Sequence, residues 1–219
     1  MHDNERAAPR LIAYTDYKSP YAFVAKNATL ALALEYRIDI EWRPYTLRIA
    51  EYLDAVDARS AHNWRKVRYA YMDARRLANR QGLVLKGPRR IYDGTLSSIG
   101  MLYAQRAGFF PAYHDSTFER FWRHDLDIDA MDAMRAHIAT LGGDPDGFEA
   151  YAQGPGAEVH RELVAQAEAA GVFGVPSILL DGELFWGGDR LDAVRAAIES
   201  HLATGAAQAR GAASGRSAG

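Results

Sequence analysis

The amino-acid sequence predicts an α/β fold in which a four-stranded mixed sheet is interrupted by a large helical insertion. Two strand signals separated by a helical pattern occupy residues 11–43, near the start of the chain. A strand, a tight turn and a second strand follow at residues 176–186. Between these regions the sequence shows almost no strand signal, only helical patterns punctuated by glycine.

The first part of the chain reads as a strand–helix–strand unit. Residues 11–15 are rich in β-branched and aromatic side chains, which favours a strand. Ser19 followed by Pro20 is a typical helix start, and the apolar spacing continues to about Tyr36. Residues 38–43 then alternate apolar and charged side chains. Two strands joined by a helix of this length are expected to be parallel, with a right-handed crossover.

The middle of the chain is predicted to be helical, and the end returns to strand. Glycines separate the expected helices at 64–81, 94–107, 112–123, 129–141 and 157–170. Asp181-Gly182 is a tight-turn signal between strands 176–180 and 183–186. A last amphipathic helix begins at Gly187-Gly188-Asp189 and carries its apolar face to Leu202.

This element order matches a thioredoxin-like topology, in which the two ends of the chain complete one sheet. We therefore expect a discontinuous thioredoxin-like domain of residues 11–50 and 171–204. Residues 51–170 would form an inserted all-helical domain. Residues 1–10 and 205–219 are expected to be disordered tails, because the latter are rich in Ala, Gly, Ser and Arg.

Composition excludes several classes of function. The formal net charge is −2, and the 26 basic and 28 acidic residues are interspersed, so no nucleic-acid partner is expected. No apolar stretch approaches the ~20 residues that span a bilayer, and the charged N-terminus lacks the apolar core of a secretion signal. We therefore expect a cytoplasmic protein without a membrane partner.

Cysteine is absent from the sequence. A disulfide framework, a zinc–thiolate site and chemistry on a thiol of the protein are thereby excluded. The seven histidines do not show the spacing of a common metal motif, so no metal is expected.

Two features have the right residue types to bind a ligand, although each also has a purely structural interpretation. Ser19 could simply cap its helix, or its hydroxyl could donate a hydrogen bond to a thiolate carried by a small molecule. Pro176 could open its strand through a trans bond. A cis Val175–Pro176 bond, which we favour, would leave the backbone of Val175 free to pair with a peptide-like ligand.

Charged residues offer two further candidates. Asp189 and Arg190 could cap the last helix, or hold the ammonium and carboxylate of an amino-acid-like ligand. Lys66 would by default be a solvated charge near a helix start. A ligand carboxylate could instead compensate its charge, which is unfavourable at that end of a helix.

Taken together, these motifs resemble the 2-hydroxychromene-2-carboxylate isomerase family, which is similar to kappa-class glutathione transferases and DsbA-like oxidoreductases. The resemblance covers about residues 11–203. It is carried by Ser19-Pro20-Tyr21, Trp42-Arg43-Pro44, Asn63-Trp64-Arg65-Lys66 with Tyr69 and Asp73, and most specifically by residues 171–176 continuing through 181–191.

The resemblance implies glutathione as cofactor, an aromatic or conjugated organic acid as substrate, and a homodimer. Ser19 would stabilise the glutathione thiolate, and Val175 before a cis Pro176 would pair with the cysteinyl part of glutathione. Asp189 and Arg190 would lie at the γ-glutamyl end, and Lys66 near a carboxylate of glutathione or of the substrate. The thiolate would add reversibly to a conjugated double bond and so allow cis/trans isomerisation.

Three positions depart from the family pattern. Lys18 stands directly before the serine, where many relatives carry an apolar residue, and its charge would either act on the sulfur or face solvent. Asp57 falls near the place of an expected asparagine, and Arg48 replaces a glycine-like position. These departures concern the acceptor site and the reaction more than the fold. The alternatives are a glutathione transferase, a DsbA-like or glutathione-linked oxidoreductase, which the absence of cysteine disfavours, and a non-catalytic binding protein, which the intact Ser19, Lys66 and Asp189-Arg190 disfavour.

Overall fold

The computed structural model describes residues 9–49, 51 and 56–215. Four strands form one sheet in the order β2-β1-β3-β4. The strands are β1 (Leu11–Thr15), β2 (Ile40–Pro44), β3 (Ser177–Leu180) and β4 (Glu183–Trp186). β1 pairs in parallel with β2 and antiparallel with β3, and β3 pairs antiparallel with β4. The two ends of the chain therefore complete one mixed sheet, and the predicted fold class is confirmed.

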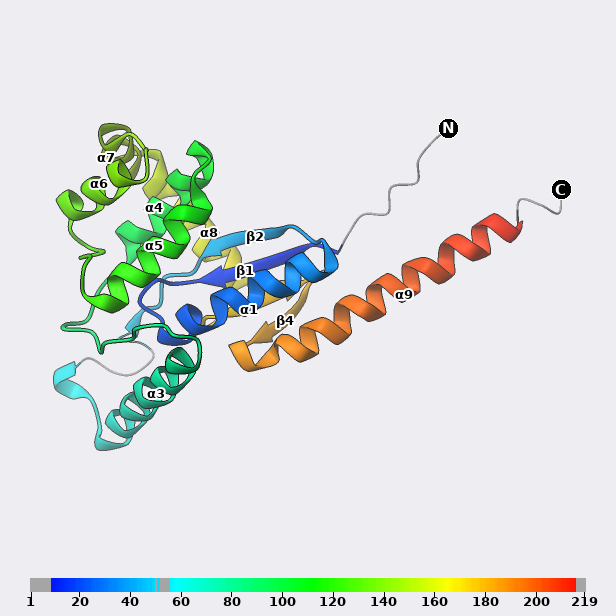
Figure 1. The fold of residues 1–219 in the computed structure, drawn as a ribbon, viewed down its shortest axis with the longest axis horizontal. Helices are drawn as coiled ribbons and strands as arrows, with labels where there is room; N and C mark the ends of the chain where they lie inside the picture. Colours follow the sequence, from blue (N-terminus) through cyan, green and yellow to red (C-terminus); the bar gives the residue numbers. More distant parts are fainter. Residues whose placement is uncertain (1–8, 50, 52–55, 216–219) are drawn as a thin grey trace.

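Helices account for most of the remaining described chain (Figure 1). Helix α1 (Pro20–Tyr36) joins β1 to β2, and α9 (Leu191–Gly215) follows β4 after the short 3-10 turn η2 (Gly188–Arg190). Between β2 and β3 lie η1 (Val56–Ala58), α3 (Ala61–Arg80), α4 (Thr95–Ala107), α5 (Phe110–Arg123), α6 (Met131–Thr140), α7 (Pro145–Gln153) and α8 (Pro155–Ala169).

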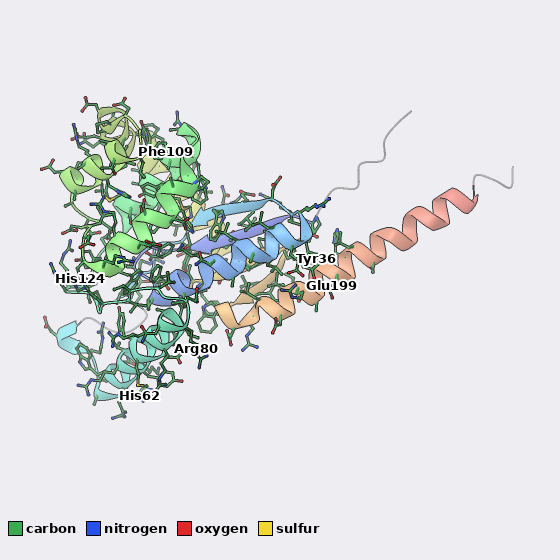
Figure 2. All side chains as sticks on the ribbon, in the orientation of Figure 1. Tyr36, His62, Arg80, Phe109, His124 and Glu199 are labelled. Carbon is green, nitrogen blue, oxygen red and sulfur yellow. The ribbon has the colours of Figure 1, made fainter. Side chains whose placement is uncertain are left out.

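Strand β1 is buried along its whole length because both faces of the sheet are covered. Leu11 and Ala13 belong to a cluster that includes Val194 and Ile198 of α9. The alternate side chains, starting with Ile12, enter the larger core formed with the helical insertion. At the solvent edge, Tyr36 Oη of α1 donates to Glu199 Oε1 of α9 at 2.6 Å (Figure 2).

Two predictions about helices are corrected by the structure. Residues 205–215 continue α9 as helix instead of starting a tail. Alanine, which is frequent among them, has the highest intrinsic helix propensity. Helix α7 falls where the sequence indicated only a glycine-rich break, and it buries Phe148, Tyr151 and Ala152. Tertiary burial stabilises this short helix. Residues 1–8 and 216–219, the rest of the expected tails, lie outside the described residues.

No helix within the described residues is both long enough and apolar enough to cross a membrane.

A buried histidine gives the core a predictable sensitivity to acid. His114 of α5 lies 3.2 Å from Tyr17 Oη through Nδ1, and its Nε2 has no hydrogen-bond partner in the described chain. Burial, with Lys26 nearby, lowers the pKa of His114 to about 3. Burial next to Arg120 likewise lowers the pKa of His137 to about 4.

We predict that the free energy of unfolding falls as the pH drops below about 6.5, the ordinary pKa of histidine. The unfolded chain then takes up protons that the native state excludes, at about 1.4 kcal/mol per pH unit for each histidine. Urea unfolding between pH 6 and pH 5 measures this slope. His114→Phe is expected to reduce the slope by one histidine's share, and equal slopes in both proteins would contradict this assignment.

Candidate functional site

Ser19 caps α1 and also reaches the segment before β3. Its Oγ accepts a hydrogen bond from the Ala22 N–H at 3.2 Å and donates to the Val175 carbonyl at 3.4 Å. The residue is 3% exposed. The structure thus confirms the helix cap and brings Ser19 to Val175. Because the bond to Val175 is long, the hydroxyl hydrogen is available to a closer acceptor.

The backbone around Ser19 contains donors that the described chain does not use. The first turn of α1 contains no acidic side chain, and the Tyr21 N–H has no acceptor among the described residues. Free N–H groups at a helix start favour negative charge beside them.

The Val175–Pro176 bond is cis, as we favoured from the sequence. The Pro176 carbonyl accepts a hydrogen bond from the Gly187 N–H at 2.9 Å. The Val175 N–H donates to no acceptor in the described part of the chain. The residue that Ser19 contacts through its carbonyl therefore retains a free backbone N–H donor.

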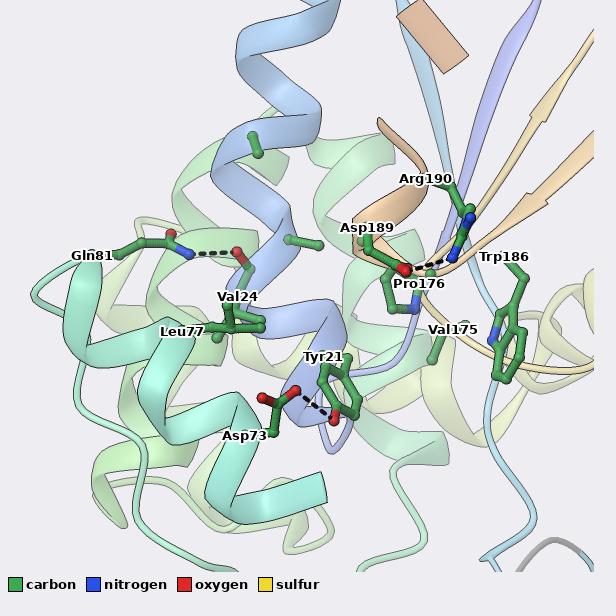
Figure 3. Close-up of a pocket in the computed structure, with 14 residues that line it drawn as sticks. Tyr21, Val24, Asp73, Leu77, Gln81, Val175, Pro176, Trp186, Asp189 and Arg190 are labelled. Carbon is green, nitrogen blue, oxygen red and sulfur yellow. Dashed lines mark hydrogen bonds and ion pairs between the residues drawn. The ribbon is translucent and has the colours of Figure 1, made fainter. Parts of the chain in front are cut away.

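A cavity of about 850 Å³ opens beside this backbone (Figure 3), and we call it the Pro176 cavity. Its lining comes from α1, α3, the Val175–Pro176 segment and the β4–η2 connection, and comprises Tyr21, Val24, Ala25, Ala28, Asp73, Leu77, Gln81, Val175, Pro176, Trp186, Gly187, Gly188, Asp189 and Arg190. The cavity is mostly apolar, with a few polar groups, as expected of a small-molecule site.

Two hydrogen bonds join α1 to α3 across this cavity. Tyr21 Oη donates to Asp73 Oδ2 at 3.1 Å, and Gln81 Nε2 donates to the Val24 carbonyl at 2.8 Å (Figure 3). Burial and the bond to Asp73 raise the pKa of Tyr21 to about 12. The phenol therefore stays protonated and remains a donor at neutral pH. Neither Tyr21 nor Asp73 was among our candidate site residues.

Asp189 and Arg190 line the same cavity from η2, so the structure places both predicted residues beside Val175 and Pro176. Their side chains are largely exposed and pair with each other at 2.7 Å. Glycine at position 188 allows this arrangement, because a Cβ there would lie 2.9 Å from the Ala25 Cβ. A larger residue would push η2 away from α1.

Two candidates are not among the lining residues: Ser19 reaches the cavity only through its contact with Val175, and the other is Lys66. It is exposed on α3 and does not belong to the lining. Lys66 precedes Asp73 by seven residues, so both lie on the same side of the helix, about 10 Å apart along its axis. The sequence predicted the helix but could not show how far along it the cavity would extend.

Lys18 is buried instead of facing solvent. Its ammonium pairs with Asp16 Oδ2 at 2.7 Å, and the two side chains are 5% and 0% exposed. Asp16 also accepts hydrogen bonds from the backbone N–H groups of Lys18 and Leu47. This pair fixes the segment that leads into Ser19, whose N–H donates to the Asp16 carbonyl.

The DsbA-like thioredoxin domain model matches residues 10–199, most of the chain. The chain belongs to this family. The match includes Ser19, the cis proline segment and the η2 pair. In this DsbA-like domain, serine caps the first helix and the described residues contain no cysteine.

Relatives of this DsbA-like domain include named isomerases. A 2-hydroxychromene-2-carboxylate isomerase from Pseudomonas putida is 28% identical over 81% of this chain and 88% of its own length. One from Sphingobium xenophagum is 27% identical over 82% of this chain and 92% of its own length.

Solved structures agree with the family assignment. A 2-hydroxychromene-2-carboxylate isomerase superposes with a TM-score of 0.74 at 26% identity, covering 90% of this chain and 98% of its own. A probable DsbA oxidoreductase from Streptomyces coelicolor has a TM-score of 0.73 at 17% identity, covering 89% and 90%. The latter likeness concerns the fold alone.

Within the described residues, no group of three or more His, Cys, Asp or Glu side chains could hold a metal ion.

Proposed function

We propose that this DsbA-like domain is a glutathione-dependent isomerase of the 2-hydroxychromene-2-carboxylate type. The observation that carries the proposal is the contact between Ser19 and Val175 at the edge of the Pro176 cavity. The Ser19 hydroxyl lies there, and the neighbouring Tyr21 and Val175 N–H groups have no acceptor among the described residues. The chain has no cysteine of its own. Such a site suits a thiolate that arrives with a ligand.

The cavity suits glutathione in its chemistry. The free Val175 N–H can pair with the cysteinyl part of a peptide-like ligand. Asp189 and Arg190 carry the two charges needed for the ammonium and carboxylate of a γ-glutamyl group, and can exchange their mutual ion pair for it.

The charges of the lining residues also bear on the orientation of bound glutathione. Arg190 is the single cation among the described lining residues, beside the anions Asp73 and Asp189. The second carboxylate of glutathione therefore needs a cation from outside the lining. Lys66 lies on the same side of α3 as Asp73, nearer the start of the helix. Its ammonium would pair with the carboxylate at the glycyl end of glutathione.

Bound glutathione would supply the thiolate that adds reversibly to the conjugated bond. The protein's contribution is to hold that sulfur ionised. Ser19 Oγ–H would turn from Val175 to donate to the sulfur, and the first turn of α1 would present the free Tyr21 N–H. Tyr21, held by Asp73, would keep α1 and α3 together around the ligand.

The direct test is isomerisation of 2-hydroxychromene-2-carboxylate, followed by absorbance with and without glutathione. We expect turnover only when glutathione is present. Turnover that is unchanged without glutathione would overturn the cofactor assignment. An absence of turnover on this and related benzylidenepyruvate-like acids, with glutathione bound, would overturn the isomerase assignment.

Arg190→Gln should raise the glutathione concentration for half-maximal rate by about 10- to 100-fold, since one charge-assisted hydrogen bond is worth about 1.5–3 kcal/mol. Arg195→Gln is the matched control, because Arg195 lies on α9 and pairs with Glu35 outside the cavity. An equal rise in the half-maximal glutathione concentration for both variants would show that Arg190 does not bind glutathione.

A further inference from the structure

A second cavity, of about 580 Å³, lies on the other side of α3, between this helix and residues 87–92. We call it the Lys18 cavity. Lys18 lines it at the buried end, and Arg68 and Arg89 line it at exposed positions. Lys18 immediately precedes Ser19 in the chain, and Ser19 contacts Val175, which lines the Pro176 cavity.

The lining of the Lys18 cavity is strongly cationic. The described lining residues include one lysine and five arginines but no acid. Among these cations, Lys18 is neutralised by Asp16, and Arg90 by Asp127 and Asp129. Arg68 and Arg89 form no ion pair with any described residue. A positive rim without counter-charges favours an anionic ligand.

The floor of the cavity is apolar and aromatic. Trp64, Met72 and Ile91 line it, although they are 36%, 41% and 45% exposed. Tyr71 and Tyr92 add aromatic surface. Apolar surface beside exposed arginines suits a planar organic acid, whose body can pack on the apolar residues while its charges pair with the arginines.

Lys18 retains one donor for such a ligand. An ammonium group has three N–H donors. Asp16 Oδ2 accepts one at 2.7 Å, and the Asp93 carbonyl accepts another at 2.5 Å. The third has no acceptor among the described residues. A ligand anion can therefore bind Lys18 without displacing either partner.

We propose that the Lys18 cavity binds a planar organic substrate with two anionic groups at opposite ends. The third N–H of Lys18 holds the inner group, and Arg68 and Arg89 hold the outer one. This inference rests on the proposed isomerase function, and it narrows the substrate to a dianionic conjugated acid. Lys18, which would hold the inner group, directly precedes Ser19 in the chain.

The test is calorimetric titration without glutathione, so that its outcome is independent of the proposed function. The probes are naphthalene dicarboxylate, with carboxylates at opposite ends, and naphthoate, which has one. We expect the dicarboxylate to bind at least about tenfold more tightly, which is the effect of one added charge-assisted hydrogen bond.

Lys18→Met and the double variant Arg68→Gln/Arg89→Gln should each abolish this preference. Arg76→Gln, an exposed change on α3 outside the cavity, should leave it intact. If Lys18→Met does not fold, the test uses Arg68→Gln/Arg89→Gln alone, because both arginines are exposed. Equal affinities for both probes, or a preference that survives the double variant, would overturn the proposal.

The two proposals fail separately. A dicarboxylate preference in a protein that does not bind glutathione would refute the isomerase while the cavity assignment stands. Glutathione-dependent turnover in a protein with equal probe affinities would refute the dianion assignment alone.

Discussion

Ser19→Ala is expected to reduce glutathione-dependent turnover by about 10²–10³-fold, the usual cost of removing one hydrogen-bond donor from a developing or full negative charge. The hydroxyl is the side-chain donor that lies between the start of α1 and Val175. Without it, the thiol pKa of bound glutathione should rise toward its ordinary value. The thiolate absorbance of the complex, recorded as a function of pH, measures that pKa. The turnover assay measures the rate separately.

The same substitution removes a helix cap, so the control must remove one as well. Ser60 caps α3 and accepts from the Asn63 N–H at 3.1 Å, much as Ser19 accepts from Ala22. Each cap contributes about 1 kcal/mol to stability. Ser60→Ala should lower stability while leaving the rate nearly unchanged. Equal losses of rate in both variants would mean that Ser19 acts only as a cap.

Asp16→Ala is expected to lower the free energy of unfolding by about 3–5 kcal/mol, because it leaves a buried ammonium without its counter-charge. Asp16 is fully buried and accepts hydrogen bonds from the Lys18 ammonium and from two backbone N–H groups. After the change, the Asp93 carbonyl would be the remaining described acceptor for Lys18. Urea unfolding measures the loss.

The double variant Asp16→Ala/Lys18→Met provides the control. It removes the unpaired charge together with its partner, so part of the lost stability should return. The recovery should be incomplete because the N–H groups of Lys18 and Leu47 still lack their acceptor. A loss below about 1 kcal/mol for Asp16→Ala alone would show that the pair behaves like an exposed ion pair.

Local signals in the sequence predicted the parts of the site that lie on the sheet and its adjoining helices. Ser19 before Pro20 indicated the start of α1, and the turn after β3 set the positions of Asp189 and Arg190. These residues meet because the sheet topology brings both ends of the chain together. The family resemblance predicted Ser19, Val175, Pro176, Asp189 and Arg190 as one group, and the last four line one cavity.

The contribution of the insertion could not be predicted in the same way. Lys66, Asp73 and Leu77 share one side of α3, but the position of α3 against α1 depends on tertiary contacts such as Tyr21 with Asp73. Periodicity reveals the side of a helix, not the point along it where a cavity begins. The charge of Lys18 likewise appeared as a departure, whereas its burial against Asp16 depends on the fold.

The central claim is that the chain binds glutathione as a thiolate. Calorimetric titration with glutathione at neutral pH, repeated in buffers of different ionisation enthalpy, counts the protons released on binding. Because a free thiol has a pKa of about 8.5, the account predicts release of nearly one proton, and none with S-methylglutathione. Binding without proton release, or no binding at millimolar glutathione, would contradict it.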